Sequence, residues 1–268
     1  MLEIGRRQVV RRFLVGIVVC AIAASCRPIN QTTERNTPTV TLTVSAAASL
    51  QAVLEAIDPQ FHAAHPEIAI DYNFGSSGSL QQQIEQGAPV DVFFSAAAKQ
   101  MDALESEGLL VSSSRQNLLA NRLVLIAPQE STLEITDLQQ LRTTPIERLA
   151  VGEFRSVPAG QYAEQVFATL NLQESLQAKF VFGNNVRSVL AVVESGNADL
   201  GVVYATDAAL SQKMKVLLKV PEEFHQPIVY PIAILERSPH PEAARTLTEF
   251  LQQEAAQATF QDFGFDRP

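Results

Sequence analysis

The stretch VTLTVSAAASLQAVLEAIDPQFHAAHPEIAIDYNFGSSGSL, residues 40–80, decides the fold class. Within it, residues 40–45 alternate apolar and polar side chains and residues 68–74 are again apolar-rich, so both segments are predicted strands. Between them, one face of a helix is marked by Leu50, Val53, Leu54, Ile57 and Phe61. Pro59 lies within this stripe, and we expect it to split the helix in two. A strand, a helix and a second strand in this order predict a βαβ unit.

The same alternation continues to the carboxyl end of the chain. Further strands are predicted at residues 91–94, 123–127, 149–152, 180–182, 200–204 and 228–235. The helices predicted between and after them are centred on residues 80–84, 97–107, 159–170, 186–193 and 241–257. Strands separated by helices predict an α/β protein, and the runs before and after about residue 120 predict two lobes. Each lobe is expected to be a mostly parallel sheet flanked by helices.

The amino-terminal residues have the pattern of an export signal. Residues 6–12 contain four arginines, and residues 13–24 form an apolar run that is too short to span a bilayer but fits a signal peptide. The run ends at Ala-Ala-Ser-Cys, residues 23–26, which resembles a bacterial lipobox. We therefore predict a signal peptide over residues 1–25, lipidation of Cys26 and a flexible tether over residues 26–39. Cleavage at an ordinary site, with Cys26 incidental, is the alternative.

The amino-terminal segment predicts where the protein is located. The charge of the remaining chain excludes nucleic acid as a partner. The protein is expected to be exported, to the periplasm or the outer face of the cytoplasmic membrane, where the lipid would anchor it. The formal net charge is −9, and with residues 1–25 set aside the 20 basic and 29 acidic residues fall to 16 and 28. Such an acidic body repels phosphate groups, so no nucleic acid is expected as a partner.

Candidate functional residues lie in the turns that follow the predicted strands, because ligands of open α/β sheets bind beyond the carboxyl ends of the strands. The turns at residues 45–49, 75–79, 157–160 and 183–186 offer hydroxyls, small residues and helix amino-terminal amides, and Tyr204 ends a further strand. Such amides bind anions without the help of a cation. The recurrence predicts a compact oxyanion held by neutral donors, although each serine or asparagine taken singly is typical of a helix cap.

Five segments in these turns resemble the periplasmic molybdate-binding proteins, the solute receptors of bacterial molybdate ABC importers. They are AAASL (46–50), FGSSGSL (74–80), VPAGQYA (157–163), NVRSVLAVVESG (185–196) and LGVVYATDA (200–208). In that family two serine hydroxyls, two backbone amides and a tyrosine hydroxyl hold the oxyanion. The matching positions in this chain are Ser49, Ser77, Ala159, Val186 and Tyr204. At Gly78, where the family commonly has a further serine, this chain lacks the hydroxyl.

The resemblance implies a two-lobed periplasmic-binding-protein fold of type II, in which the chain crosses between the lobes twice. The implied lobes are residues 40–119 with 237–268, and residues 120–236. The implied function is binding of molybdate and tungstate in the cleft between the lobes, and delivery to the membrane permease of an ABC importer. No enzymatic activity, no cofactor and no free metal cation are implied, since molybdenum is bound as its oxyanion. A receptor that docks one copy at a time is expected to be a monomer.

Elementary chemistry separates some oxyanions from others in a site that only donates hydrogen bonds. Molybdate, tungstate and sulfate carry no proton at pH 7, so such a site satisfies all their oxygens. Hydrogen phosphate carries a proton that needs an acceptor, and leaving it unpaired costs ~1–3 kcal/mol. Molybdate and sulfate present the same charge and acceptors, so cavity size must separate them. A sulfate receptor therefore remains an alternative at this point.

Two further alternatives use other residues. Arg155 and Arg187 would form the guanidinium clamp of a receptor for a small carboxylate or phosphonate. An exported serine hydrolase would need G-x-S-x-G or a serine with a histidine base, and residues 75–79 lack that spacing. His62 and His65 are three residues apart without a third candidate ligand, so a metal site is not predicted.

Overall fold

The computed structural model describes residues 40–268. The signal peptide predicted at residues 1–25, the lipidation predicted at Cys26 and the tether predicted over residues 26–39 lie outside the described residues. From residue 40 onward, no helix has the length and apolar character needed to cross a membrane.

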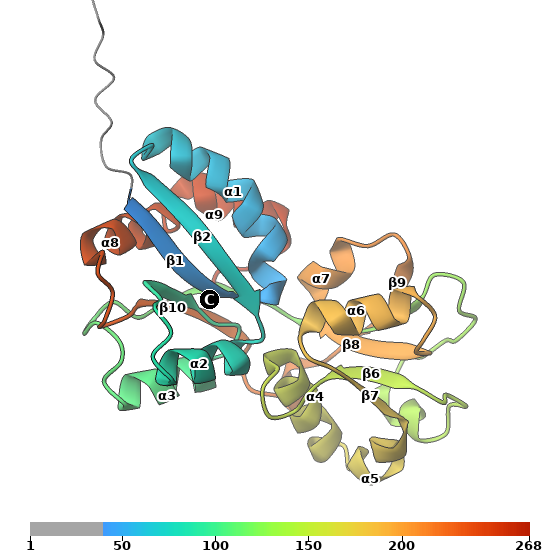
Figure 1. Ribbon diagram of the computed structural model, residues 1–268. Helices are drawn as coiled ribbons and strands as arrows, with labels where there is room; N and C mark the ends of the chain where they lie inside the picture. The colour runs from blue at the N-terminus through green and yellow to red at the C-terminus, as the bar shows by residue number, and fades with distance from the viewer. Residues whose placement is uncertain (1–39) are drawn as a thin grey trace, which may run out of the picture. The chain divides into compact units, whose positions relative to one another are not determined.

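The first sheet contains five strands in the order β2-β1-β3-β10-β4 (Figure 1). They are β1 (Val40–Ala47), β2 (Ile68–Gly75), β3 (Val92–Phe94), β4 (Gln116–Ala120) and β10 (Val229–Ile234). Strand β1 is parallel to β2 and β3, whereas β10 is antiparallel to β3 and β4. The carboxyl ends of β1, β2 and β3 therefore lie at one edge of the sheet.

The second sheet also contains five strands, in the order β7-β6-β8-β5-β9. They are β5 (Leu123–Pro128), β6 (Leu149–Gly152), β7 (Phe180–Gly183), β8 (Leu200–Tyr204) and β9 (Met214–Lys219). Strand β6 is parallel to β7 and β8, whereas β5 is antiparallel to β8 and β9. The carboxyl ends of β6, β7 and β8 thus also share one edge.

Two expectations about the sheets are corrected by these pairings. Both sheets are mixed, with two parallel and two antiparallel pairings each, and are not mostly parallel. Strand β10 and Ala120 belong to the first sheet, whereas the division at residues 120–236 had assigned both to the second lobe. The chain returns to the first sheet between β9 and β10, before the predicted boundary. Apolar periodicity marks a strand but carries no information about which sheet it joins.

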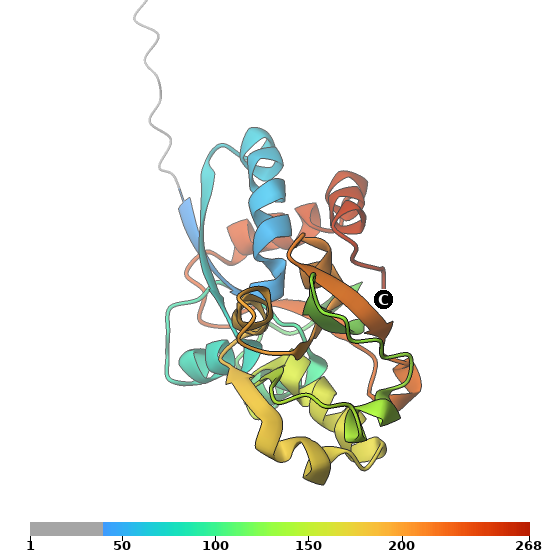
Figure 2. The same ribbon diagram turned by 90° about the vertical axis from the view of Figure 1, so that its right-hand side faces the viewer.

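Helices cover both faces of each sheet. The first sheet carries α1 (Gln51–Ala64), α2 (Ser77–Glu85), α3 (Ala98–Ser106), α8 (Pro241–Phe250) and α9 (Glu254–Asp262). Helix α1 contacts α9 on one side of this sheet, and α2 contacts α3 on the other (Figure 1 and Figure 2). The second sheet carries α4 (Pro158–Thr169), α5 (Gln173–Leu176), α6 (Val186–Glu194) and α7 (Ala205–Ala209). We call each sheet with its helices the first lobe and the second lobe.

Four single turns of 3-10 helix complete the described elements. They are η1 (Ala48–Leu50), η2 (Leu138–Arg142), η3 (Gln177–Lys179) and η4 (Glu222–Phe224). Of these, η1 matters for function because it joins β1 to α1 and contains Ser49.

The predicted helical stripe after β1 is confirmed, but the predicted break at Pro59 is wrong. Helix α1 runs through Pro59 without interruption and buries Val53, Leu54, Ile57 and Phe61. The proline ring is exposed, so the loss of its N–H affects only the solvent face while Ile57 and Phe61 anchor the helix on either side. The stripe of apolar contacts therefore outweighs one missing hydrogen bond.

The helix predicted over residues 241–257 is in fact two helices, α8 and α9, separated by a turn at residues 251–253. Glutamine side chains donate hydrogen bonds to backbone carbonyl groups at this interruption of the helix. Gln252 Nε2 donates to the Thr248 carbonyl at 2.9 Å, and Gln257 Nε2 donates to the Leu251 carbonyl at 2.9 Å. These contacts allow a helix end to be buried without unpaired backbone groups.

Candidate functional site

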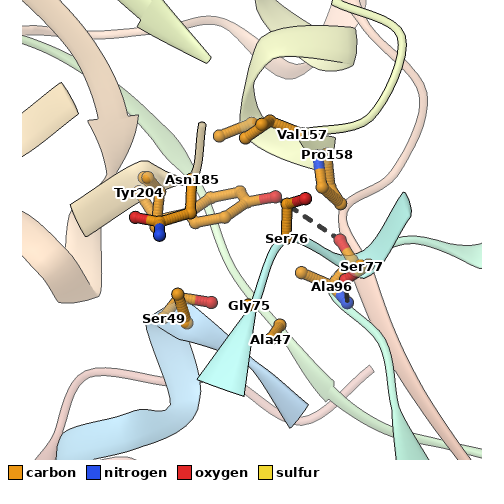
Figure 3. A pocket seen from close by; sticks show the side chains of 13 residues that line it. Ala47, Ser49, Gly75, Ser76, Ser77, Ala96, Val157, Pro158, Asn185 and Tyr204 are labelled. Carbon is orange, nitrogen blue, oxygen red and sulfur yellow. Dashed lines mark hydrogen bonds between the residues drawn. The ribbon is translucent and has the colours of Figure 1, made fainter. Parts of the chain in front are cut away.

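All five residues predicted as ligand groups line one pocket. The pocket has about 200 Å³ of empty space, including its opening to solvent. Its lining comprises Ala47, Ala48, Ser49, Gly75, Ser76, Ser77, Ala96, Val157, Pro158, Ala159, Asn185, Val186 and Tyr204 (Figure 3). Both lobes contribute, since the residues up to Ala96 come from the first and the others from the second.

The pocket lies where helices begin. Ser49 is in η1 directly ahead of α1, and Ser77 is the first residue of α2. Ala159 is the second residue of α4, and Val186 is the first residue of α6. The first amides of a helix have no partner within it and carry the positive end of the helix dipole. Two helix starts from each lobe therefore favour negative charge in this space.

The hydroxyl of Ser77 is held in the orientation of a donor. Ser77 is fully buried, and its Oγ accepts the Ala96 N–H at 2.9 Å. The neighbouring Ser76 caps α2, because its Oγ accepts the Ser79 N–H at 3.3 Å. Ser76 therefore has the helix-cap role, and the Ser77 hydroxyl hydrogen is free to point into the pocket.

The amides of Ala159 and Val186 are exposed to the pocket for local reasons. Pro158 has no N–H, so Ala159 presents the first amide of α4. A Cβ on Gly160 would lie 2.1 Å from the Gly152 carbonyl oxygen, so glycine there lets α4 start directly against β6. At α6, Asn185 Oδ1 accepts the Ser188 N–H at 2.9 Å, which caps the helix and leaves the Val186 amide open.

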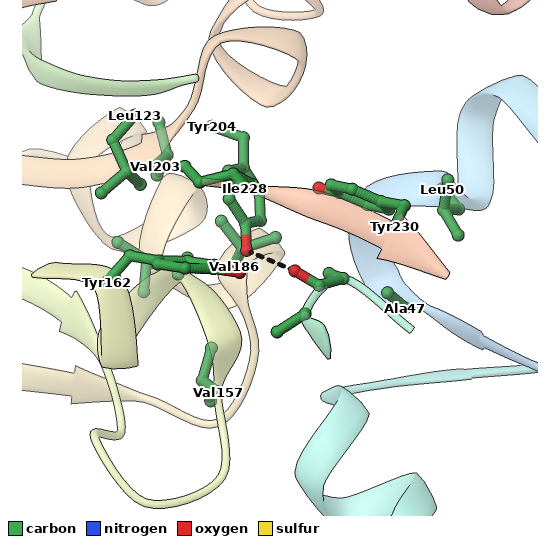
Figure 4. Packing of buried hydrophobic residues seen from close by; sticks show 14 of the residues in the cluster. Ala47, Leu50, Leu123, Val157, Tyr162, Val186, Val203, Tyr204, Ile228 and Tyr230 are labelled. Carbon is green, nitrogen blue, oxygen red and sulfur yellow. Dashed lines mark hydrogen bonds between the residues drawn. The ribbon is translucent and has the colours of Figure 1, made fainter. Parts of the chain in front are cut away.

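Tyr204 ends β8 with its side chain in the same pocket. Its hydroxyl donates to the Ala96 carbonyl oxygen at 3.4 Å, a long hydrogen bond between the two lobes (Figure 4). Burial raises the pKa of Tyr204 well above its usual value, so the phenol stays protonated at neutral pH. A stronger acceptor in the pocket can therefore receive this hydrogen in place of the Ala96 carbonyl.

Sequence reasoning missed Ala96. Its N–H binds Ser77 and its carbonyl accepts from Tyr204, so one residue of the turn after β3 holds two of the predicted ligand groups. The available signal was positional, because residues 95–97 follow a predicted strand just as the other turns do. The residue types gave a second signal, because Ser-Ala-Ala at residues 95–97 offers the same hydroxyl and small side chains as the turn at residues 45–49.

The pocket contains no charged side chain. The thirteen residues of the described chain that line the pocket are all neutral. Arg155 is 92% exposed and pairs with Glu153 at 3.0 Å, and Arg187 pairs with Asp207 at 3.1 Å. Both arginines are engaged elsewhere, so the alternative of a guanidinium clamp has no support from the geometry. The part of the chain that the structure describes also holds no group of three metal-ligating side chains.

The lobes touch closely beside the pocket. The Gly78 N–H donates to the Ser156 carbonyl at 2.9 Å, and Gln100 Nε2 donates to Gln161 Oε1 at 3.1 Å. A Cβ on Gly78 would lie 2.5 Å from the Ser156 carbonyl oxygen. The missing side chain at Gly78, noted from the sequence as a missing hydroxyl, thus permits backbone-to-backbone contact between the lobes.

Comparisons with known proteins agree with this architecture. The model of the family described as bacterial extracellular solute-binding protein matches residues 42–266. The chain is 38% identical over 253 residues to YvgL of Bacillus subtilis, whose name assigns it provisionally to the ABC transporter substrate-binding lipoproteins, covering 94% of this chain and 96% of YvgL. It is 35% identical over 227 residues to the molybdate-binding protein ModA of Haemophilus influenzae, covering 84% and 89% of the two chains.

A solved structure shows the same fold. The periplasmic molybdate-binding protein of Azotobacter vinelandii superposes with a TM-score of 0.76 at 26% identity, covering 85% of this chain and 99% of that chain. The two-lobed architecture of mixed sheets flanked by helices is therefore that of the periplasmic binding proteins.

Proposed function

Since the chain belongs to the bacterial extracellular solute-binding proteins, we propose that it binds molybdate and tungstate in this pocket and delivers them to the permease of an ABC importer. One observation carries the proposal: serine hydroxyls and helix amino-terminal amides from both lobes converge on a pocket whose lining is uncharged. The molybdate-binding relatives support the choice of ligand. The role is binding and not catalysis.

Each group has a part in this proposal. The hydroxyls of Ser49, Ser77 and Tyr204 donate to the oxyanion, together with the backbone amides of Ala159 and Val186. A hydrogen bond to a charged group contributes roughly 1.5–3 kcal/mol, so five would give on the order of 8–15 kcal/mol before ordering and lobe closure are subtracted. Submicromolar binding needs more than ~8 kcal/mol net, which these groups can supply without a salt bridge.

The location and delivery step follow from the same family. An oxyanion that contacts both lobes stabilises the form in which they touch, and a permease can recognise that form. We propose that the protein is exported and attached to a membrane through lipid on Cys26, an arrangement supported by the lipoprotein name of the Bacillus relative. No cofactor is required for this function.

Calorimetric titration of residues 27–268, which leave out the predicted signal peptide and Cys26, tests the ligand directly. Molybdate and tungstate are expected to bind tightly with 1:1 stoichiometry, with sulfate at least a hundredfold weaker and hydrogen phosphate weaker still. Tight sulfate binding would mean that the protein is a receptor for sulfur uptake that uses the same oxyanion site. Absence of binding by all four anions would show that the serine turns are helix caps only.

Gly78 offers a test of lobe contact that leaves every ligand group in place. Gly78→Ala is expected to weaken molybdate binding about five- to tenfold, because the new Cβ would meet the Ser156 carbonyl oxygen at 2.5 Å and hold the lobes apart. The melting temperature without ligand should change little, since alanine is well tolerated in the first turn of a helix. Titration and thermal unfolding of the same preparation measure both quantities. Unchanged affinity would mean that binding does not need this contact.

A further inference from the structure

A buried tyrosine outside the pocket lining contacts one of the proposed ligand groups. Tyr230, the second residue of β10, places its Oη 3.0 Å from Ser49 Oγ. Tyr230 is fully buried and Ser49 is 3% exposed, so water does not compete for this hydrogen bond. Tyr230 belongs to the same buried cluster as Leu50 and Ala47 (Figure 4).

Asn121 donates a hydrogen bond to Tyr230 and thereby occupies one of the two acceptor lone pairs of its hydroxyl oxygen. It lies in the crossover between β4 and β5, and its Nδ2 donates to Tyr230 Oη at 3.1 Å and to Thr206 Oγ1 at 2.9 Å. Its Oδ1 accepts the Arg122 N–H at 2.8 Å, which sets the orientation of the amide group. Asn121 therefore gives one of its two side-chain hydrogens to Tyr230.

Either hydroxyl can donate in the contact between Tyr230 and Ser49. The arrangement that leaves the Ser49 hydrogen for an anion in the pocket is the one in which Tyr230 Oη accepts from Asn121 and donates its own hydrogen to Ser49 Oγ. Ser49 Oγ accepts this hydrogen, and its own hydrogen remains for the pocket. Burial raises the pKa of Tyr230 well above its usual value, so the phenol hydrogen is present at neutral pH.

We propose that Tyr230 and Asn121 are positioning residues that hold Ser49 as a donor toward the oxyanion, and that they thereby help the site reject oxyanions that carry a proton. The inference rests on the proposed function and extends it to two residues that do not touch the ligand. Ser77 Oγ likewise accepts the Ala96 N–H, so in this arrangement each serine has one of its two lone pairs engaged. Each serine then keeps a single lone pair, which makes it a poorer acceptor for the proton of hydrogen phosphate than a free hydroxyl would be.

Tyr230→Phe removes the donor to Ser49 and keeps the ring in the core. We expect molybdate binding to weaken about fivefold, and the ratio of molybdate to hydrogen phosphate affinity to fall, because the freed Ser49 oxygen can accept. In a Ser49→Ala background the same Tyr230→Phe change should have no further effect on molybdate affinity. A merely structural role for Tyr230 would weaken binding equally in both backgrounds.

Two more variants make the result decisive. Tyr162→Phe is the matched control, because Tyr162 is also buried but its hydroxyl contacts the Pro227 carbonyl at 3.5 Å and not Ser49; its affinities should stay within twofold of the wild type. Asn121→Asp replaces the donor to Tyr230 with an acceptor, so Tyr230 would turn its hydrogen away from Ser49. This variant should lose at least as much affinity as Tyr230→Phe, and it also serves if Tyr230→Phe folds poorly.

The outcomes separate this proposal from the function on which it rests. A wild-type protein that binds none of the four oxyanions contradicts the proposed function and the positioning role together. If the wild type binds molybdate but Tyr230→Phe also weakens molybdate binding in the Ser49→Ala background, the positioning role alone is overturned. The positioning role is supported if Tyr230→Phe weakens molybdate binding only when Ser49 is present. The ratio of molybdate to hydrogen phosphate affinity should fall in the same variant.

Discussion

Replacing Ser77 with alanine is expected to weaken molybdate binding ten- to a hundredfold. A hydrogen bond to a charged acceptor contributes roughly 1.5–3 kcal/mol, and each 1.4 kcal/mol is a factor of ten in affinity. Ser77 is fully buried and its Oγ already accepts from the Ala96 N–H, so its hydrogen is committed to the pocket. The neighbouring Ser76 hydroxyl donates to Ser79 Oγ at 2.8 Å, so it is already engaged within the first turn of α2. Calorimetric titration of the variant measures the loss.

The Ser77 variant also leaves the buried Ala96 N–H without its acceptor, which lowers the stability of the ligand-free protein. Ser114→Ala is a matched control, because Ser114 is 7% exposed and its Oγ accepts the Ile234 N–H at 3.1 Å away from the pocket. Both variants should lower the melting temperature by a few degrees, but only Ser77→Ala should lose affinity. Equal affinity in the Ser77 variant and the wild type would remove Ser77 from the site.

Sequence patterns predicted eight of the ten described strands to within two residues at each end, and these include the edge strands β2 and β7. Strands β6 and β8 begin and end at the predicted residues, and both lie inside the second sheet with buried side chains on each face. Strands β4 and β9 were not predicted. Each lies at the edge of its sheet. Strand β4 exposes Gln116 and Asn117, and β9 exposes Val216 and Lys219, so neither alternates clearly between buried apolar and exposed polar residues. The partner of β4 is β10, which is distant in sequence and is not visible to a local pattern.

The convergence of the five proposed ligand groups on one pocket was predictable because they share one rule of position. Ser49, Ser77, Ala159 and Val186 all follow a strand and begin a helix, and Tyr204 ends a strand. The residues behind them were not predictable. Tyr230 is the second residue of an apolar strand, and the pairing of β10 with β3 and β4 brings its hydroxyl to Ser49. Residues that act through tertiary contacts leave no local trace in the sequence.

Asp207 gives the second large expected effect, on stability and not on affinity. Its carboxyl group is completely buried in α7, and its nearest cation is Arg187 at 3.1 Å. Within residues 40–268, Asp207 Oδ2 has no hydrogen-bond partner. Burial raises the pKa of Asp207 to about 7, and Arg187 opposes the shift only in part.

The sign of the resulting pH dependence follows from the direction of this shift. The unfolded carboxyl group titrates near its ordinary pKa of about 4, so between pH 4 and 7 the folded protein binds more protons than the unfolded chain. The free energy of unfolding should therefore be higher near pH 4 and should fall as the pH rises to 7. At 1.36 kcal/mol per unit of pKa, this one group accounts for a fall of up to about 4 kcal/mol.

Asp207→Asn removes the titration while keeping the size and shape of the side chain. Urea unfolding of the ligand-free protein at pH 5, 6, 7 and 8 should show a weaker decrease of stability with pH in this variant than in the wild type. The variant should be at least as stable as the wild type at pH 8, where the wild type holds a buried carboxylate. Asp262→Asn is the control, because it removes an exposed carboxylate from α9 and should leave the pH profile unchanged.

Arg187→Gln tests whether Arg187 acts on the stability of the protein through Asp207 or on the binding of the oxyanion. Without Arg187 the charged form of Asp207 loses its counterion, so stability at pH 8 should fall further below that at pH 5 than in the wild type. Affinity for molybdate should fall less than in Ser77→Ala, because Arg187 is paired with Asp207 and does not line the pocket. A larger loss of affinity in Arg187→Gln would mean that the oxyanion is held by charge and not chiefly by neutral donors. Parallel pH profiles for the wild type and Asp207→Asn would mean that Asp207 remains ionised throughout this range.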